Sequence, residues 1–152
     1  MYPSCMHMVI AFLLAQLIIS CRPSITTTSV NASIADIAAI AITIQDNYYG
    51  NSNSNLDDPP AWTVAPNANI IATVQNMGEL THNWVVVKLG ATVPIPFDEG
   101  QSSDIIFYGA GMVYGQNQTT LTFTAPGELG EYLVICTVPG HYPSMQGRLI
   151  VE

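Results

Sequence analysis

Short segments in which apolar residues recur at every second position run along the chain from residue 38, and this period constrains the fold more than any other feature. The first segment, AAIAITIQD, places Ile40, Ile42 and Ile44 two residues apart. Segments rich in β-branched residues follow at 69–76, 82–89, 119–126, 130–138 and 146–152. A period of two is typical of strands, and clusters of Gly, Pro or Asn bound each segment. The sequence therefore predicts an all-β domain built as a β-sandwich.

Two stretches interrupt this pattern. Residues 47–60 (NYYGNSNSNLDDPP) are polar and predict a long loop. Residues 98–113 follow neither the strand period nor the helix period, so the sequence leaves their structure undecided and allows a short helix there. At 152 residues, 49% of them apolar, the chain is long enough for one domain with a core of its own.

The N-terminus has the pattern of an export signal. The apolar run over residues 8–19 is shorter than the roughly 20 residues of a membrane-spanning helix and suits the apolar region of a signal peptide. It ends in Ile18-Ile19-Ser20-Cys21, which resembles the lipobox of bacterial lipoproteins. We predict a lipoprotein-type signal peptide at 1–20, lipidation of Cys21, a flexible Ser- and Thr-rich tether at 21–37 and the folded domain at 38–152.

An ordinary signal peptide, or an uncleaved anchor with an incidental Cys21, is the alternative. Either alternative predicts an exported domain. With lipidation, the domain is expected on the outer, periplasmic face of the cytoplasmic membrane.

The charge of the chain limits its partners. It carries 3 Lys and Arg against 11 Asp and Glu, a net charge of −8 at pH 7. Such a surface repels phosphate groups, which argues against nucleic acid, and it attracts a basic protein.

One ten-residue segment, CTVPGHYPSM (136–145), combines a thiol, an imidazole and a thioether. Cys136 ends a predicted strand, and prolines shape the turn that follows it. His82 is the only other histidine outside the leader, and it begins another predicted strand. Two imidazoles, a thiolate and a weak axial thioether are the ligands of blue-copper electron-transfer sites. Each residue type also occurs alone in a core or at a strand end, but their joint spacing favours a metal site.

The segments NMGELTHNW (76–84) and CTVPGHYPSMQG (136–147) resemble those of the cupredoxins, in particular azurins and auracyanins. The spacing Cys-x4-His-x3-Met is the azurin one. The resemblance extends from about residue 38 to residue 152 and implies a Greek-key β-sandwich with one type 1 copper ion. The implied ligands are His82, Cys136, His141 and Met145.

The resemblance also implies that neighbouring residues support these ligands. Asn83 is expected to tie the strand of His82 to the loop of Cys136 and to donate its backbone N–H to the thiolate. Val138 keeps a backbone N–H for a second bond of this kind. Such bonds stabilise the thiolate and tune the redox potential.

The copper loop (residues 136–147) contains no Asp, Glu, Lys or Arg, and neither does the segment 107–118, which is expected beside it. We predict an apolar docking patch around the edge of His141, although loop packing alone would also account for its residues. The patch consists of Val138, Pro139, Gly140, Tyr142 and Pro143. Acidic residues elsewhere are expected to steer a basic partner, such as a c-type cytochrome or a membrane electron-transfer complex. They are Asp57, Asp58, Asp98, Glu99, Glu128 and Glu131.

The predicted function is that of a membrane-tethered type 1 blue copper protein that carries single electrons between redox partners and is not an enzyme. Copper enzymes need further copper sites, and both histidines outside the leader belong to one site. An exported copper carrier or chaperone is the alternative, although it would favour more methionines and an open site. A structural zinc site is a third possibility, for which a ligand set of two His, Cys and Met is unusual.

Overall fold

The computed structural model describes residues 37–98, 100 and 103–152. The predicted signal peptide (1–20), Cys21, the tether up to residue 36 and Glu99 lie outside these residues. Ile37, the first described residue, already belongs to a strand. Within the described part, no helix combines the length and the apolar character that a membrane crossing requires.

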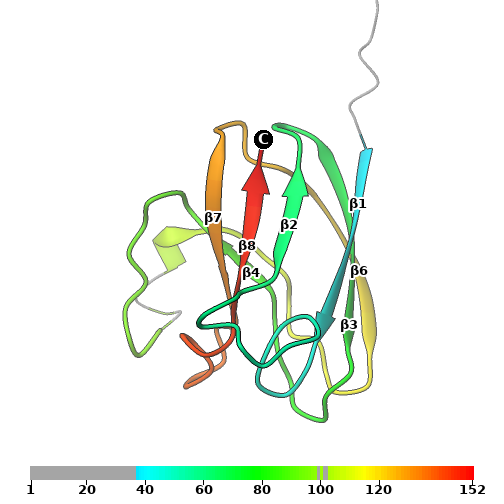
Figure 1. Ribbon diagram of the computed structural model, residues 1–152, viewed down its shortest axis with the longest axis vertical. Coiled ribbons are helices and arrows are strands. Elements are labelled where there is room, and N and C mark those ends of the chain that lie inside the picture. Colours follow the sequence, from blue (N-terminus) through cyan, green and yellow to red (C-terminus); the bar gives the residue numbers. More distant parts are fainter. Residues whose placement is uncertain (1–36, 99, 101–102) are drawn as a thin grey trace, which may run out of the picture. The chain divides into compact units, whose positions relative to one another are not determined.

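The described residues form two sheets that pack face to face (Figure 1). The order of strands is β1-β3-β6 in one sheet and β2-β8-β7-β4-β5 in the other. β1 pairs with β3, and β2 with β8, in parallel, whereas the other pairs are antiparallel. The predicted all-β sandwich is confirmed. The strands are β1 Ile37–Ile44, β2 Ala61–Val64, β3 Asn69–Asn76, β4 Val85–Val87, β5 Ile106–Gly109, β6 Gln118–Thr124, β7 Gly130–Ile135 and β8 Gln146–Val151.

The period of two explains how the sheets build a core. In β3 every second side chain is buried, beginning with Ile70 and ending with Asn76. Trp84 is fully buried between the sheets, and its ring centroid lies 5.6 Å from that of Trp62 and 5.9 Å from that of Phe123. A filled core holds the two sheets in fixed positions, so the loops at their ends start from fixed points.

Three elements differ from the expectation. β2 was not predicted, because AWTV lies between Pro60 and Pro66 and is too short to show a period. β4 is shorter than the predicted 82–89, and its three valines are all buried because both faces of the strand are covered: Val86 packs in the main hydrophobic cluster, and Val85 and Val87 pack in a second cluster on the other face. The ambiguous stretch contains a short 3-10 helix, η1 (Ser103–Ile105), followed directly by β5.

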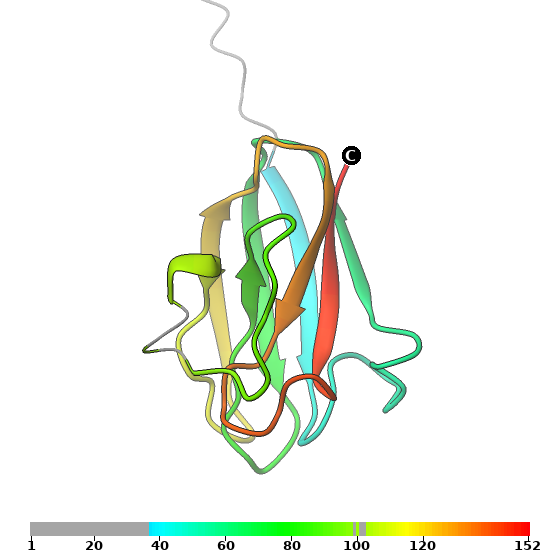
Figure 2. The same ribbon diagram turned by 90° about the vertical axis from the view of Figure 1, so that its left-hand side faces the viewer.

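The loops that follow β1, β3 and β7 gather at one end of the sandwich, the lower end in Figure 2. The predicted polar loop, which follows β1, is anchored by a buried asparagine. The side chain of Asn55 accepts a hydrogen bond from the backbone N–H of Tyr49 (2.6 Å) and donates to the carbonyl groups of Tyr49 and Ser52 (both 3.0 Å). This end of the molecule carries the predicted ligands.

Candidate metal centre

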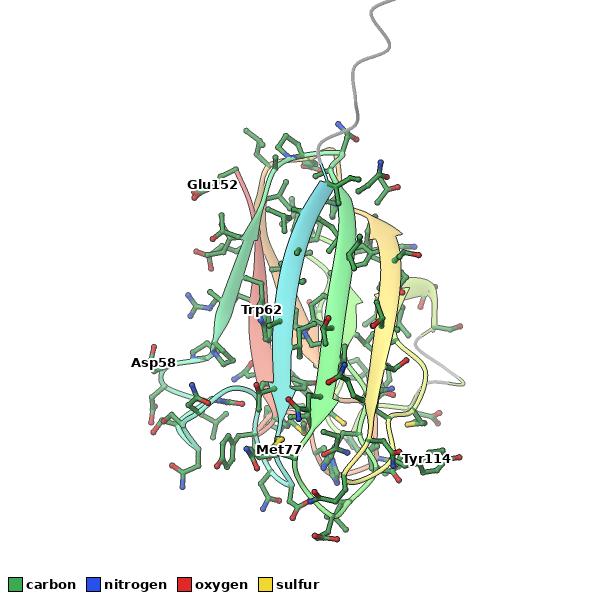
Figure 3. The ribbon with its side chains drawn as sticks, turned by 90° about the vertical axis from the view of Figure 1, so that its right-hand side faces the viewer. Asp58, Trp62, Met77, Tyr114 and Glu152 are labelled. Atoms are coloured by element: carbon green, nitrogen blue, oxygen red, sulfur yellow. The ribbon has the colours of Figure 1, made fainter. Side chains whose placement is uncertain are left out.

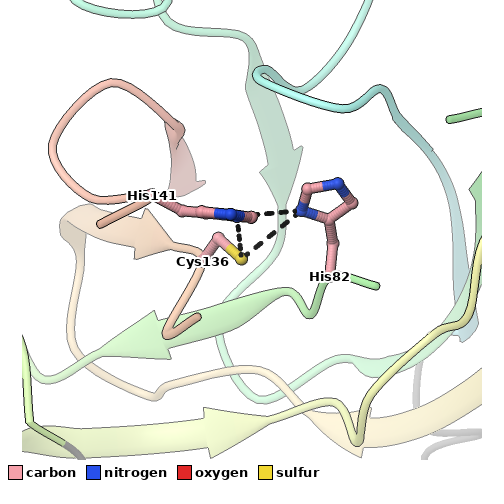
Figure 4. Close-up of side chains that lie close together, drawn as sticks. All are labelled: His82, Cys136 and His141. Carbon is pink, nitrogen blue, oxygen red and sulfur yellow. Dashed lines mark hydrogen bonds between the residues drawn. The ribbon is translucent and has the colours of Figure 1, made fainter. Parts of the chain in front are cut away.

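Three of the predicted ligand side chains meet at the end of the sandwich described above. The Nδ1 atoms of His82 and His141 lie 3.1 Å apart, and the Sγ of Cys136 lies 3.8 Å from the first and 3.6 Å from the second (Figure 4). His82 stands in the chain between β3 and β4, whereas Cys136 and His141 belong to the loop after β7. One donor atom from each of the three residues thus faces a common point.

The copper loop closes on itself through backbone hydrogen bonds. The N–H of His141 donates to the carbonyl of Val138 (3.0 Å), and the N–H of Met145 donates to the carbonyl of His141 (2.8 Å). The N–H of Cys136 donates to the carbonyl of Met145 at 3.3 Å. Met145 is fully buried in the same hydrophobic cluster as Cys136. The spacing of the motif therefore corresponds to a compact turn that begins and ends beside the cysteine.

Asn83 joins the two ligand-bearing segments. Its side-chain amide donates to the Thr137 hydroxyl (2.6 Å) and accepts from the Thr137 backbone N–H (2.8 Å), with both residues buried. The backbone N–H groups of Asn83 and Val138 hydrogen-bond to the Cys136 sulfur. Burial raises the pKa of the Cys136 thiol, and these two bonds oppose that rise. N–H donors of this kind stabilise the thiolate form that metals bind.

The backbone of His82 is hydrogen-bonded to a neighbouring segment, and its side chain is fully buried. It exchanges two backbone hydrogen bonds with Val113, at 2.7 and 3.1 Å, and its exposed fraction is 0%. Burial lowers the pKa of the His82 imidazole, and the neighbouring His141 lowers it further. Burial also lowers the pKa of His141. Both rings are therefore favoured in the neutral form, which has a lone pair for a metal.

The donor set fits one copper ion. Donor atoms bound at about 2.0–2.3 Å to the same ion lie about 3–4 Å apart, as the three observed distances do. Two neutral imidazoles whose Nδ1 lone pairs face each other at 3.1 Å repel unless a cation or a proton lies between them. A thiolate and two imidazoles, with a buried thioether in the same loop, are the donors of a type 1 copper site.

The predicted docking residues flank His141 in the chain, and they differ in exposure. Pro139 and Gly140 are exposed, whereas His141, Tyr142 and Pro143 are half-buried. Pro139 and Met112 line one surface hollow together with Thr137, so the uncharged segment 107–118 reaches the copper loop. Asp98, one of the predicted steering acids, lines the same hollow.

Sequence reasoning missed two residues behind the site. The fully buried Tyr49 donates its hydroxyl to the carbonyl of Asn83 at 2.6 Å. The carboxylate of Asp46 lies 3.9 Å from Nε2 of His82. Both residues follow β1, far from His82 in the sequence, and no local motif marks them. The parallel pairing of β1 with β3, which places Ile44 beside Asn76, is what brings them here.

Comparison with known proteins agrees with this site. Residues 50–152 match the family model described as copper binding proteins, plastocyanin/azurin family. Auracyanin-A of Chloroflexus aurantiacus is 38% identical over 87 residues, which is 47% of this chain and 51% of that protein. The match thus spans about half the length of this curated relative.

Solved structures share the fold. Auracyanin A, a "blue" copper protein from Chloroflexus aurantiacus, superposes with a TM-score of 0.57 at 27% identity, covering 76% of this chain and 99% of that one. Dithionite-reduced auracyanin from Roseiflexus castenholzii gives a TM-score of 0.60 at 29% identity, covering 75% and 96%. The expected cupredoxin-like Greek-key sandwich is confirmed. The chain therefore belongs to the plastocyanin/azurin family of copper-binding proteins, the cupredoxins, with His82, Cys136, His141 and Met145 arranged as a type 1 copper site.

Proposed function

We propose that this protein carries single electrons between redox partners outside the cytoplasm, tethered to a membrane by a lipid on Cys21. One observation carries the electron-transfer part of the proposal. The donor atoms of His82, Cys136 and His141 already lie 3.1–3.8 Å from one another, and the side chains of His82 and Cys136 are fully buried. A site built in advance reorganises little when its charge changes, which favours rapid electron transfer over catalysis.

The chemistry that copper supplies when bound is a one-electron couple between Cu(II) and Cu(I). The residues of the chain make both oxidation states acceptable, because thiolate and thioether suit the reduced ion and imidazole suits both. The bonds between Asn83 and Thr137 hold the two ligand segments in one arrangement. The side chain of His82 is fully buried, whereas that of His141 is half-buried, so a partner protein would reach the site through His141.

The surface near His141 supports docking of another protein. Pro139, Gly140, Tyr142 and Pro143 carry no charge, and Met112 beside Pro139 is 48% exposed. Met77 and Tyr114, also exposed, lie at the end of the sandwich opposite Glu152 (Figure 3). An apolar surface of this kind releases water when a partner covers it. The partner class that the charge of −8 favours is a basic protein, such as a c-type cytochrome or a basic face of a membrane complex.

A copper titration followed by a transfer assay tests the proposal. The mature domain is loaded with Cu(II), reduced with ascorbate and mixed with an oxidised basic c-type cytochrome. We expect an intense blue colour that ascorbate bleaches reversibly, followed by stoichiometric reduction of the cytochrome. A loaded protein that releases copper readily to a mild chelator and reduces no cytochrome would instead be a carrier or chaperone, and a colourless, tightly metallated protein would hold zinc.

The anchor needs its own measurement. Mass spectrometry of the N-terminus of the full chain, expressed in a bacterium that processes lipoproteins, is expected to find a diacylglyceryl group on Cys21 as the first residue. An N-terminus at another residue, or an unmodified Cys21, would contradict the lipid anchor and leave the electron-transfer proposal standing.

A further inference from the structure

The buried edge of His82 that faces away from Cys136 contains an unsatisfied polar group. With Nδ1 turned toward Cys136 and His141, the ring proton of a neutral His82 belongs on Nε2. Nε2 is buried and, within the described part of the chain, has no hydrogen-bond partner. His141 differs, because its half-buried ring reaches solvent. A buried N–H without a partner is costly, so what lies beside Nε2 matters.

Among the described residues, a carboxylate lies close to this atom, that of Asp46. Its Oδ1 lies 3.9 Å from Nε2, which is too long for a hydrogen bond and within the range of an ion pair. A proton on Nε2 is attracted to the carboxylate, whereas a lone pair on Nε2 would be repelled by it. The carboxylate thus favours the one neutral tautomer whose Nδ1 lone pair faces the metal site.

The position of the carboxylate is fixed by the loop that leads to His82. Oδ1 of Asp46 accepts hydrogen bonds from the backbone N–H groups of Glu79 (2.7 Å) and Leu80 (2.8 Å). Gly78 makes room for it, since a Cβ added there would overlap Oδ1 and would lie 2.8 Å from the backbone nitrogen of Asp46. From the other side, the Gln116 side chain donates to the carbonyl groups of Met77 (2.8 Å) and Gly78 (3.2 Å). The carboxylate therefore does not swing freely, although its side chain is 38% exposed.

We propose that Asp46 is a positioning residue for the copper ligand His82: it holds the imidazole in the Nε2–H tautomer, and its negative charge stabilises the oxidised state of the site. Partners that orient metal-binding histidines through the second ring nitrogen commonly tune the metal in this way. The second half of the proposal rests on the proposed one-electron function, whereas the first half concerns the protein without metal.

The decisive variant is Asp46→Asn, because it removes the charge and keeps an oxygen that accepts from Glu79 and Leu80. In the copper-loaded protein we expect the blue colour to remain and the preference for Cu(II) over Cu(I) to fall about tenfold, a rise of about 59 mV in potential for a one-electron couple. In the copper-free protein, ¹⁵N NMR of the imidazole is expected to show His82 almost wholly as the Nε2–H tautomer in the wild type and as a mixture in Asp46→Asn.

Two further variants separate charge from position. Glu152→Gln removes the same charge beyond the far end of β8, six residues and about 20 Å from Gln146, which pairs with Ile135 next to Cys136, and should leave the potential unchanged. Gly78→Ala keeps every charge but displaces residue 46, both its carboxylate and its backbone, and should raise the potential as Asp46→Asn does. If Asp46→Asn fails to fold, the His82 tautomer of the copper-free wild type decides the question. A shift in Asp46→Asn no larger than that in Glu152→Gln, or an unchanged His82 tautomer, would overturn the proposal. A wild-type protein that is blue but reduces no cytochrome would overturn the electron-carrier function alone.

Discussion

At the scale of single residues, Cys136 has two roles that one substitution can separate. It is fully buried in the main hydrophobic cluster, and its sulfur accepts two backbone N–H groups beside the imidazoles. Cys136→Ser retains the small size and an acceptor atom but removes the thiolate. We expect the blue colour to be lost on adding Cu(II), while circular dichroism shows that the strands remain. A blue Cys136→Ser protein would mean that a residue other than Cys136 forms the bond to copper that gives the colour.

Met145 is expected to act through the preference of its sulfur for Cu(I). In Met145→Gln an oxygen donor favours Cu(II), so the reduction potential should fall while the colour remains. The matched control is Met112→Gln, since Met112 is 48% exposed and lies outside the ligand set. Voltammetry of the two variants checks this, and an unchanged potential in Met145→Gln would exclude Met145 as the axial ligand.

At the scale of elements, the link between the two ligand-bearing segments is a pair of side chains. Thr137→Val keeps the shape of the side chain and removes the acceptor of the Asn83 amide, which is then left unpaired in a buried place. We expect the copper-free protein to lose about 1–3 kcal/mol of unfolding free energy. Thr122→Val, on an exposed position of β6, is the control and should change little. Urea denaturation of both variants gives the comparison.

The parallel pair of β2 and β8 depends on a glycine. A Cβ at Gly147 of β8 would lie 2.7 Å from the ring of Trp62 in β2, and that ring packs against Trp84. Gly147→Ala should therefore lower the unfolding free energy by about 1–3 kcal/mol through overpacking. Gly111→Ala, with no atom within 4 Å of its added Cβ, serves as the control in thermal unfolding. Equal melting temperatures for the two variants would contradict this packing.

A feature could be predicted from the sequence when the residues that form it lie close together in the chain. Cys136, His141 and Met145 lie within one turn, so their spacing alone indicated a shared site. His82 could be added because few histidines remained. Asp46 and the short β2 could not, because their partners lie in distant strands paired in parallel, and such pairing leaves no local pattern. Tyr49 was hidden for the same reason, inside a loop whose composition indicates only polarity.

At the scale of the whole molecule, charge and docking surface are separate features. The chain has a net charge of −8, whereas the copper loop has no charged side chain. Association with a basic cytochrome should therefore be fast at low salt and should slow by about tenfold or more between 10 mM and 500 mM ionic strength, because screening removes the steering. Stopped-flow reduction rates measure this. Rates independent of salt would show that the acids do not guide the encounter.

The direction of β1 has a practical consequence for attaching this protein to a surface. The strand starts at Ile37 and ends at Ile44 beside Asn76, so it runs about 23 Å toward the end that holds the imidazoles. Any linkage made through the residues before Ile37 joins the domain at its opposite pole. A label, an electrode or a resin coupled at that pole therefore leaves the end of the domain that holds His141 free of the attachment point.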